Sequence, residues 1–459
     1  MENVHFESLY PDTARFAEIE KLLAFVKEGN SCQLVSLPGV GRSTIFRLLA
    51  YNRAIRIKHL GENQKWFHFV IVNFSEVRNQ PLFAATKLLF LSLIESLRER
   101  KLEKEYKKVD AILKEVLDRN DELVLFQGLK KAIDFLAIEK ELTIVFLFDR
   151  LEEYIPQISP QFFTNLQALR NIAKYRFSVV FSLSRPLEDL LEPSFFTDFY
   201  EFVSGHTIYL SLFDTPGTDF RIAYLEKVCG KTVDKKLLDE ILKITAGHGK
   251  LTKLCVEAIL NNETIEQWNN VTLTTFLLEQ KPVLAGLYEI WQSLMPHEQQ
   301  FITNVILNKL SVIPSAVEES RHDNQHLENI YLMQDDKITI PLFTEFVKQH
   351  SQSTMKQFNN GTIVFDPTTN QIKKGAVVIS DTLTSAEFKL LRFLLQNQDR
   401  IIEREDIIHA VWPESKNAQG VSDQAIDQLI FRLRHKIEDD PNTPKHLETI
   451  KGRGFRFLP

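Results

Sequence analysis

Cysteine is scarce in this chain, and long apolar runs are missing. Three cysteines occur in 459 residues. Cys32, Cys229 and Cys255 lie far apart and have no histidine at ligand spacing, so neither a disulfide framework nor a structural zinc site is indicated. The longest apolar runs, such as residues 142–148, are far shorter than the ~18 residues of a membrane span. We therefore expect a cytoplasmic protein without membrane association.

An overall excess of positive charge is also missing. The formal net charge is -6, which argues against a protein coated in nucleic acid, because binding to the phosphate backbone relies on Lys and Arg. The 99 residues from Gly361 onward carry 14 Lys and Arg against 14 Asp and Glu. This C-terminal segment is therefore neutral overall, and a local basic surface is compatible with it.

Short β-branched runs alternate with helical patterns in the first part of the chain, and a polar stretch separates this part from the rest. The expected strands are residues 32–37, 67–74, 142–148, 177–181 and 207–210. Such alternation predicts an α/β domain with a parallel sheet. The expected domains are an α/β domain (1–213), a helical lid (214–280), a compact unit (281–348), a linker (349–360) and a C-terminal domain (361–459). Within the compact unit we expect a helix near 298–307 and a strand pair near 330–340.

The first expected strand leads into a loop suited to binding phosphate. Glycines let backbone N–H groups surround a phosphate, and the following helix adds its dipole. The candidate nucleotide-binding residues here are Gly39, Gly41, Arg42, Ser43 and Thr44. The consensus GxxxxGK[ST] has Lys where Arg42 stands, and the bulkier guanidinium lacks the compact ammonium that reaches the β and γ phosphates. We expect nucleotide binding with little hydrolysis.

An acid at the end of a later strand is the second signal. Asp149 ends the apolar run 144–148, where P-loop ATPases hold Mg²⁺, so Asp149 and Ser43 are the candidate magnesium ligands. The position that usually carries the water-activating acid holds Arg150. Glu152 or Glu153 is left as a substitute, and we assign no catalytic residue.

A third run, residues 182–185, places polar groups at the end of another strand, where a γ-phosphate sensor would lie. The simpler interpretation is a Rossmann-like sheet whose strand ends carry ordinary turn residues. The order of the three signals along the chain favours an ATPase-derived domain.

The first 350 residues resemble the STAND branch of P-loop ATPases, which is related to the AAA+ fold. The motifs that carry the resemblance are LPGVGRST, FLFDRLEE, FSLSRP and the lid turn TAGHGKL, in which Lys250 replaces the usual Pro. Residues 281–348 are similar to the winged-helix module that often follows this lid. The resemblance implies a switch that responds to nucleotide state, with ATP and Mg²⁺ as ligands. The departures at Arg42 and Arg150 affect turnover more than binding.

The C-terminal segment has the pattern of a helix-turn-helix followed by a basic hairpin. Strand patterns at 362–365, 371–373 and 376–379 precede a helix with capping-box spacing at Thr384 and Glu387. A helix at 404–412 follows, and a third helix begins after Ser422. Its expected buried stripe is Ile426, Leu429, Ile430, Leu433 and Ile437. A helix that carries cations fits the major groove, and a basic turn at 447–457 reaches a neighbouring groove or phosphates.

This segment closely resembles the OmpR/PhoB-type winged-helix effector domain of bacterial response regulators. The motifs are LTSAEFKLLRFLLQN, REDIIHAVWP, VSDQAIDQLIFRLRHKIEDDP and ETIKGRGFRF. The candidate DNA-binding residues that the pattern and the resemblance give are Arg432, Arg434, Lys436, Thr449, Lys451 and Arg453. The first strand ends in Ser36 and Leu37 rather than in the acidic pair of a receiver domain, so phosphorelay control is not expected.

The leading hypothesis is a sequence-specific transcription regulator whose winged helix is controlled by a nucleotide-sensing, hydrolysis-poor domain. One alternative is an active STAND NTPase that acts as a stress or defence sensor, with DNA binding secondary. A second alternative is a protein-binding scaffold for which nucleotide is irrelevant. The expected partners are double-stranded DNA, further copies of the chain on DNA, and RNA polymerase or a sensor protein.

Overall fold

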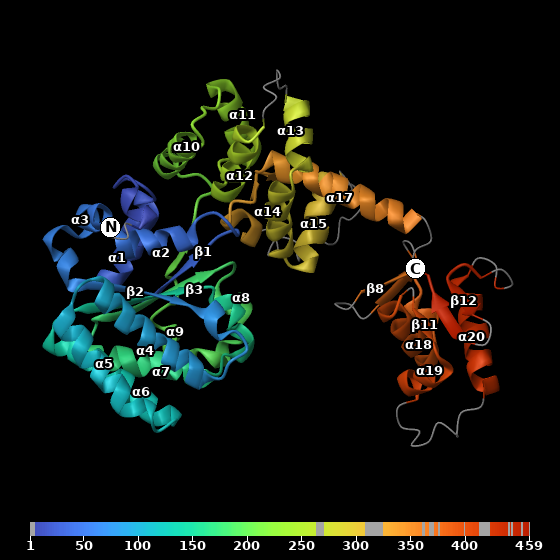
Figure 1. Ribbon diagram of the computed structural model, residues 1–459, viewed down its shortest axis with the longest axis horizontal. Coiled ribbons are helices and arrows are strands. Elements are labelled where there is room, and N and C mark those ends of the chain that lie inside the picture. The colour runs from blue at the N-terminus through green and yellow to red at the C-terminus, as the bar shows by residue number, and fades with distance from the viewer. Residues whose placement is uncertain are drawn as a thin grey trace. The chain divides into compact units, whose positions relative to one another are not determined.

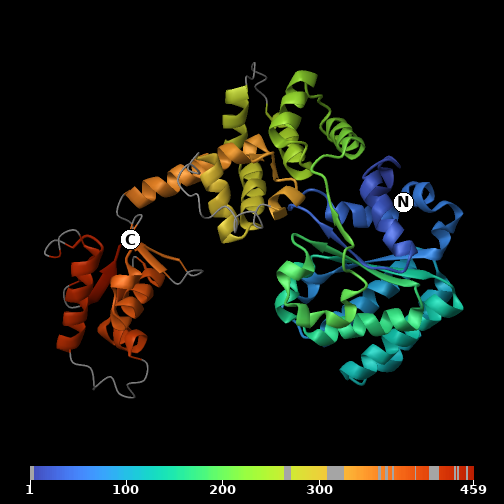
Figure 2. The same ribbon diagram turned by 180° about the vertical axis from the view of Figure 1, so that it is seen from behind.

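The computed structural model describes residues 5–262, 270–307, 325–359, 363–366, 371–374, 377–398, 400–412, 423–438, 441, 444–450 and 453–458. The chain divides into two compact units, Met1–Val347 and Lys348–Pro459, which we describe separately (Figure 1, Figure 2). No helix in the described ranges is both long enough and apolar enough to cross a membrane.

A five-stranded parallel sheet forms the centre of the first unit. Its strands are β1 (Cys32–Val35), β2 (Phe67–Asn73), β3 (Thr143–Asp149), β4 (Phe177–Leu183) and β5 (Thr207–Tyr209), in the order β2-β3-β4-β1-β5. All five expected strands are confirmed. The strand order reverses beside β1, and in such sheets ligands bind outside the carboxyl ends of the strands at the reversal.

Helices cover both faces of this sheet, as Figure 1 shows. One face carries α1 (Phe16–Lys27), α2 (Arg42–Tyr51) and α3 (Arg53–Leu60). The other side carries α4 (Leu82–Glu99), α5 (Glu103–Leu117), α6 (Glu122–Asp134) and α7 (Pro160–Ala173), with the short helices α8 (Leu187–Leu190) and α9 (Thr197–Tyr200) before β5. Phenylalanines of β3, β4 and α7 pack together on the sheet, and Phe148 meets Phe181 edge to face at a centroid distance of 5.6 Å. The sheet is therefore buried on both faces, as a parallel sheet requires.

The expected helical lid follows the sheet. It consists of α10 (Thr215–Cys229), α11 (Lys235–Thr245), α12 (Gly249–Leu260) and α13 (Asn270–Glu279). The next elements are α14 (Lys281–Gln292), α15 (Pro296–Ile306), β6 (Met333–Gln334), β7 (Lys337–Ile338) and α17 (Pro341–Asn359). The predicted helix near residue 298 and the predicted strand pair near 330–340 are therefore present.

The polar stretch predicted as a linker is helical. The boundary between the two units falls between Val347 and Lys348, next to the start of the predicted linker, but α17 continues to Asn359. The stretch has only Met355 and Phe358 as apolar residues, but it contains neither Gly nor Pro before Gly361, so a helix can continue through it.

The second unit is a winged helix-turn-helix, as expected. Its elements are β8 (Ile363–Asp366), β9 (Gln371–Lys374), β10 (Val377–Val378), α18 (Ser385–Gln396), β11 (Ile401–Ile402), α19 (Arg404–Val411), α20 (Asp423–Ile437), β12 (Leu447–Ile450) and β13 (Gly454–Phe457). The strands form two antiparallel sheets, β10-β9-β8 and β11-β13-β12. The capping box of Thr384 and Glu387 is present at the start of α18, whereas the predicted N-cap Ser422 lies outside the described residues.

The core of the second unit confirms the helical phase predicted for α20. The five residues of the expected stripe are all buried, namely Ile426, Leu429, Ile430, Leu433 and Ile437. Gly454 begins β13 with φ +127, and a Cβ atom there would collide with the backbone of Ile402 in β11. The close pairing of β11 and β13 therefore requires glycine.

Candidate nucleotide site and nucleic-acid interface

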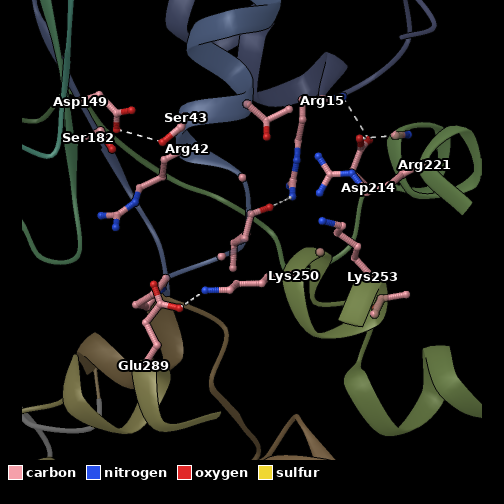
Figure 3. A pocket seen from close by; sticks show the side chains of 18 of the residues that line it. Arg15, Arg42, Ser43, Asp149, Ser182, Asp214, Arg221, Lys250, Lys253 and Glu289 are labelled. Carbon is pink, nitrogen blue, oxygen red and sulfur yellow. Dashed lines mark hydrogen bonds and ion pairs between the residues drawn. The ribbon is translucent and has the colours of Figure 1, made fainter. Parts of the chain in front are cut away.

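A cavity of about 650 Å³ lies at the carboxyl end of β1, within the range of small-molecule sites. The loop after β1, the ends of β3 and β4, and helices α10, α12 and α14 supply its lining (Figure 3). Gly41 is the N-cap of α2 with φ +130, so the first turn of α2 directs free N–H groups and the positive end of the helix dipole toward this space. The cavity therefore combines suitable volume with an anion-binding helix terminus.

All six residues predicted to bind nucleotide or magnesium line this one cavity, namely Gly39, Gly41, Arg42, Ser43, Thr44 and Asp149. The Ser43 hydroxyl donates to Asp149 Oδ1 at 3.0 Å. Magnesium in phosphate-transfer sites takes one or two protein oxygens and completes its shell with water and substrate phosphate. The adjacent hydroxyl and carboxylate fit that role, and the described residues contain no cluster of three or more His, Cys, Asp or Glu that would bind a metal alone.

The two acids left as substitutes for the missing water-activating group are both paired with cations. Glu152 lies 3.2 Å from Arg42 Nη1 and accepts the backbone N–H of Ser184. Glu153 pairs with Arg78 and, at 3.3 Å, with Arg150. Each carboxylate is thus engaged by a guanidinium, which makes it a poor base for activating water.

The glycine-rich turn of the lid is fixed directly to the phosphate loop. His248 Nδ1 accepts the N–H of Leu251, so Nε2 carries the proton and donates to Pro38 O at 2.9 Å. Burial lowers the pKa of His248 to about 4, which keeps the ring neutral near pH 7. The N–H of Lys250 also donates to Gly39 O at 3.0 Å.

Gly39 makes this close approach of lid and loop feasible. It has φ +80, and a Cβ atom would lie 2.7 Å from Lys250 Cβ. A side chain at this position would therefore push the lid away from the phosphate loop.

Four cations that were not among the predicted site residues also line the cavity. They are Arg15, Arg221, Lys250 and Lys253. Arg15 is buried and donates to the carbonyl oxygens of Val40 and Ser211, each at 2.7 Å. The side chains of Lys250 and Lys253 extend from α12 into the view of the cavity in Figure 3, where Lys250 pairs with Glu289 of α14. The lid cations lie about 200 residues from the loop motif in the sequence, so no local pattern predicts that they line the same cavity.

The residues predicted as a sensor at the end of β4 take two directions. Ser182 lines the cavity. Arg185 instead forms a buried ion pair with Glu298 at the start of α15, and Glu298 also accepts the N–H of Met295 at 2.8 Å. The end of β4 is thus joined to the module after the lid.

In the second unit, one of the three predicted cations of α20 projects outward. Arg432 is exposed and its Nε lies 3.9 Å from Glu387 Oε1. Arg434 donates to Leu447 O at 2.7 and 2.9 Å and to Thr449 Oγ1 at 2.7 Å, and burial lowers its pKa. Arg434 and Thr449 therefore fasten the wing to α20.

Lys436 is fixed in a similar way. Its ammonium donates to Glu387 Oε2 at 2.7 Å and to Thr382 O. Burial opposes ionisation of Glu387, but hydrogen bonds from Lys436 and Thr384 outweigh it and hold the pKa of Glu387 below its usual value. In the wing, Arg453 is exposed, and Lys451 lies outside the described residues.

Comparison with known proteins finds a family model that matches part of the second unit. Residues 381–457 match the family described as "Transcriptional regulatory protein, C terminal". The chain is 33% identical over 103 residues to the sensory transduction protein RegX3 of Mycolicibacterium smegmatis, which covers 22% of this chain and 43% of that protein. It is 28% identical over 134 residues to the transcriptional regulatory protein RstA of Escherichia coli, covering 28% and 51%. The chain thus spans about half or less of the length of these relatives.

Several solved structures are similar to parts of this chain. The RstA DNA-binding domain of Klebsiella pneumoniae, in complex with the RstA box, is 26% identical over 21% of this chain and 91% of that chain, with a TM-score of 0.18. The Walker-type ATPase of Pyrococcus abyssi is 14% identical over 75% of this chain and 100% of that chain, with a TM-score of 0.47. The Orc1 protein of Aeropyrum pernix in complex with DNA is 14% identical over 79% and 89%, with a TM-score of 0.38.

Proposed function

We propose that this chain is a sequence-specific, double-stranded-DNA-binding transcription regulator whose winged helix is controlled by nucleotide at the α/β domain. The observation that carries the proposal is the exposed Arg432 on α20, next to the hairpin β12–β13, in a domain that matches the C-terminal family of transcriptional regulators. The RstA domain that resembles it is described in complex with its DNA box. A helix and wing of this kind bind adjacent grooves of the duplex.

DNA recognition is divided among the cations of the second unit. In this proposal Arg432 contacts guanine edges or phosphates from α20, and Arg453 contacts phosphates or the minor groove from the wing. Arg434 and Lys436 contribute charge, but their hydrogen bonds to the wing and to Glu387 hold them in place. The main effect of Arg434 is to hold α20 against the wing, and that of Lys436 is to hold α20 against the start of α18.

The α/β domain binds ATP with Mg²⁺ in this account. The loop from Gly39 to Thr44 surrounds the phosphates, Ser43 and Asp149 hold the ion, and lid lysines approach from α12. Because Glu152 and Glu153 are paired with arginines, the bound nucleotide is hydrolysed poorly. The nucleotide then acts as a ligand that changes the state of the protein.

The test of DNA recognition compares Arg432→Ala with Arg400→Ala in the full-length protein. Both variants remove one exposed positive charge from the second unit. We expect Arg432→Ala to cost about 1 to 3 kcal/mol on a preferred sequence and to relax specificity at one base pair. Equal losses in the two variants on all sequences would contradict recognition of bases by Arg432.

Binding and hydrolysis of nucleotide are tested separately. Mg-ATP at 100 times its Kd is expected to stabilise the α/β domain by about 2.7 kcal/mol in thermal unfolding, while phosphate release stays near background. Absence of thermal protection would favour the scaffold alternative. Robust turnover that Asp149→Asn abolishes would favour the active NTPase.

A further inference from the structure

The side of α20 that faces away from its buried stripe carries an exposed aromatic ring. Phe431 is 59% exposed. Gln428 and His435 are also exposed, three residues before and four residues after it, so the three side chains share one face of the helix. The rings of Phe431 and His435 contact edge to face, with centroids 4.3 Å apart. A large apolar surface therefore lies at the centre of the helix face that the described residues leave uncovered.

Charged groups lie on the flanks of this face. Arg432 follows Phe431 directly and is exposed on one side. On the other side, Asp427 is paired with Arg404 of α19 at 2.6 Å, and Arg404 also lies 3.5 Å from Asp423. The acids at the start of α20 are thus compensated, which removes the repulsion that they would exert on a phosphate backbone.

The pattern of an uncharged centre with a flanking cation suits a groove of DNA. Within the major groove, thymine presents a methyl group, whereas the other exposed groups are hydrogen-bond donors and acceptors. A phenyl ring placed against a donor or acceptor would deprive it of water without replacing the hydrogen bond. Gln428 has the amide chemistry that pairs with adenine, so it suits an A·T pair near the ring.

We propose that Phe431 determines sequence preference by contacting the 5-methyl group of a thymine in the major groove. This inference rests on the proposed DNA-binding function and adds to it a residue absent from our sequence-based candidates. Arg432 beside it supplies the polar contacts, and the ring supplies a contact that depends on one methyl group.

The test uses the full-length protein and a duplex enriched by it from a random pool. Each thymine in turn is replaced by deoxyuridine, which pairs identically with adenine but lacks the methyl group. Removing one buried methyl group is expected to weaken binding about fourfold. Phe431→Ala is measured on the same set of duplexes, with Val364→Ala as control, since Val364 is an exposed apolar residue on β8.

We expect one thymine at which the wild type and Val364→Ala lose about fourfold in affinity and Phe431→Ala loses nothing. The Phe431→Ala variant should also bind the unmodified duplex at least fourfold more weakly, with unchanged thermal unfolding. Equal sensitivity of wild type and Phe431→Ala at every thymine would overturn the inference, as would an unchanged affinity of Phe431→Ala, which would point to a protein partner for the ring. Failure to enrich any sequence would instead refute the DNA-binding function itself, and the inference with it.

Discussion

Replacing Glu152 by Gln is expected to tighten binding of Mg-ATP. In the structure Arg42 lies 3.2 Å from Glu152, with side chains 14% and 31% exposed. A phosphate group must compete with this carboxylate for the Arg42 guanidinium. Gln keeps the shape of Glu and an oxygen to accept the N–H of Ser184, so the substitution removes the competing charge and little else.

The size of the effect follows from the exposure of the pair. Two unit charges 3.2 Å apart attract by about 5 kcal/mol at an effective dielectric constant of 20. Desolvation and solvent screening reduce the net value for partly exposed pairs to about 1 kcal/mol. Release of Arg42 from this pair should therefore lower the Kd for Mg-ATP about fivefold.

The assay is calorimetric titration of the full-length protein with a non-hydrolysable Mg-ATP analogue at fixed salt. Glu153→Gln is the matched control, because Glu153 lines the same cavity but pairs with Arg78 and Arg150 rather than Arg42. It should change the Kd by less than Glu152→Gln. Equal or weaker binding by a correctly folded Glu152→Gln protein would refute the competition for Arg42.

Three further predictions concern stability. Glu298→Gln should destabilise the first unit by about 3 to 5 kcal/mol in denaturant titration, since it leaves Arg185 buried and unpaired. The double variant Arg185→Leu/Glu298→Leu should recover much of this loss. A loss below about 1 kcal/mol in the single variant would contradict the buried pair. Arg434→Ala should destabilise the second unit by roughly 1.5 to 3 kcal/mol, because it removes charged hydrogen bonds to Leu447 and Thr449, whereas Arg432→Ala should leave thermal unfolding nearly unchanged. The unfolded chain protonates His248 near pH 6.5, whereas the folded chain does so only near pH 4, because burial lowers the pKa. Stability therefore rises with pH through this window and falls as the solution is acidified. The melting temperature of His248→Gln should fall less steeply between pH 6.5 and 4 than that of the wild type, and an identical slope would contradict a buried neutral ring.

The strands and the phosphate loop could be predicted because their signals are local. The run at 142–148 is almost entirely apolar and the run at 32–37 is mostly so, as expected of buried parallel strands. The residues of the loop lie close together in the chain. The sequence does not decide between Glu152 and Glu153, because only the folded chain shows which carboxylate each arginine reaches.

The remaining features depend on contacts between distant segments. Lys250 and Arg15 reach the cavity because the lid and the start of α1 pack against the loop. The periodicity of the sequence does not predict these contacts. For α20, the spacing of apolar residues gave the buried stripe correctly, but the partners of Arg434 and Lys436 lie on β12 and α18. The linker was predicted from polarity alone, whereas helix propensity continues α17 through it to Asn359.

Nucleotide control of DNA binding is tested most directly by the affinity of the full-length protein for its own upstream DNA, measured at fixed salt with and without Mg-ATP. We expect salt-sensitive binding whose Kd changes with nucleotide. A Gly39→Ala variant, in which a Cβ would meet Lys250, should lose that change while still binding DNA. Equal, tight binding in both conditions would contradict nucleotide control and leave a DNA-binding protein with an α/β scaffold.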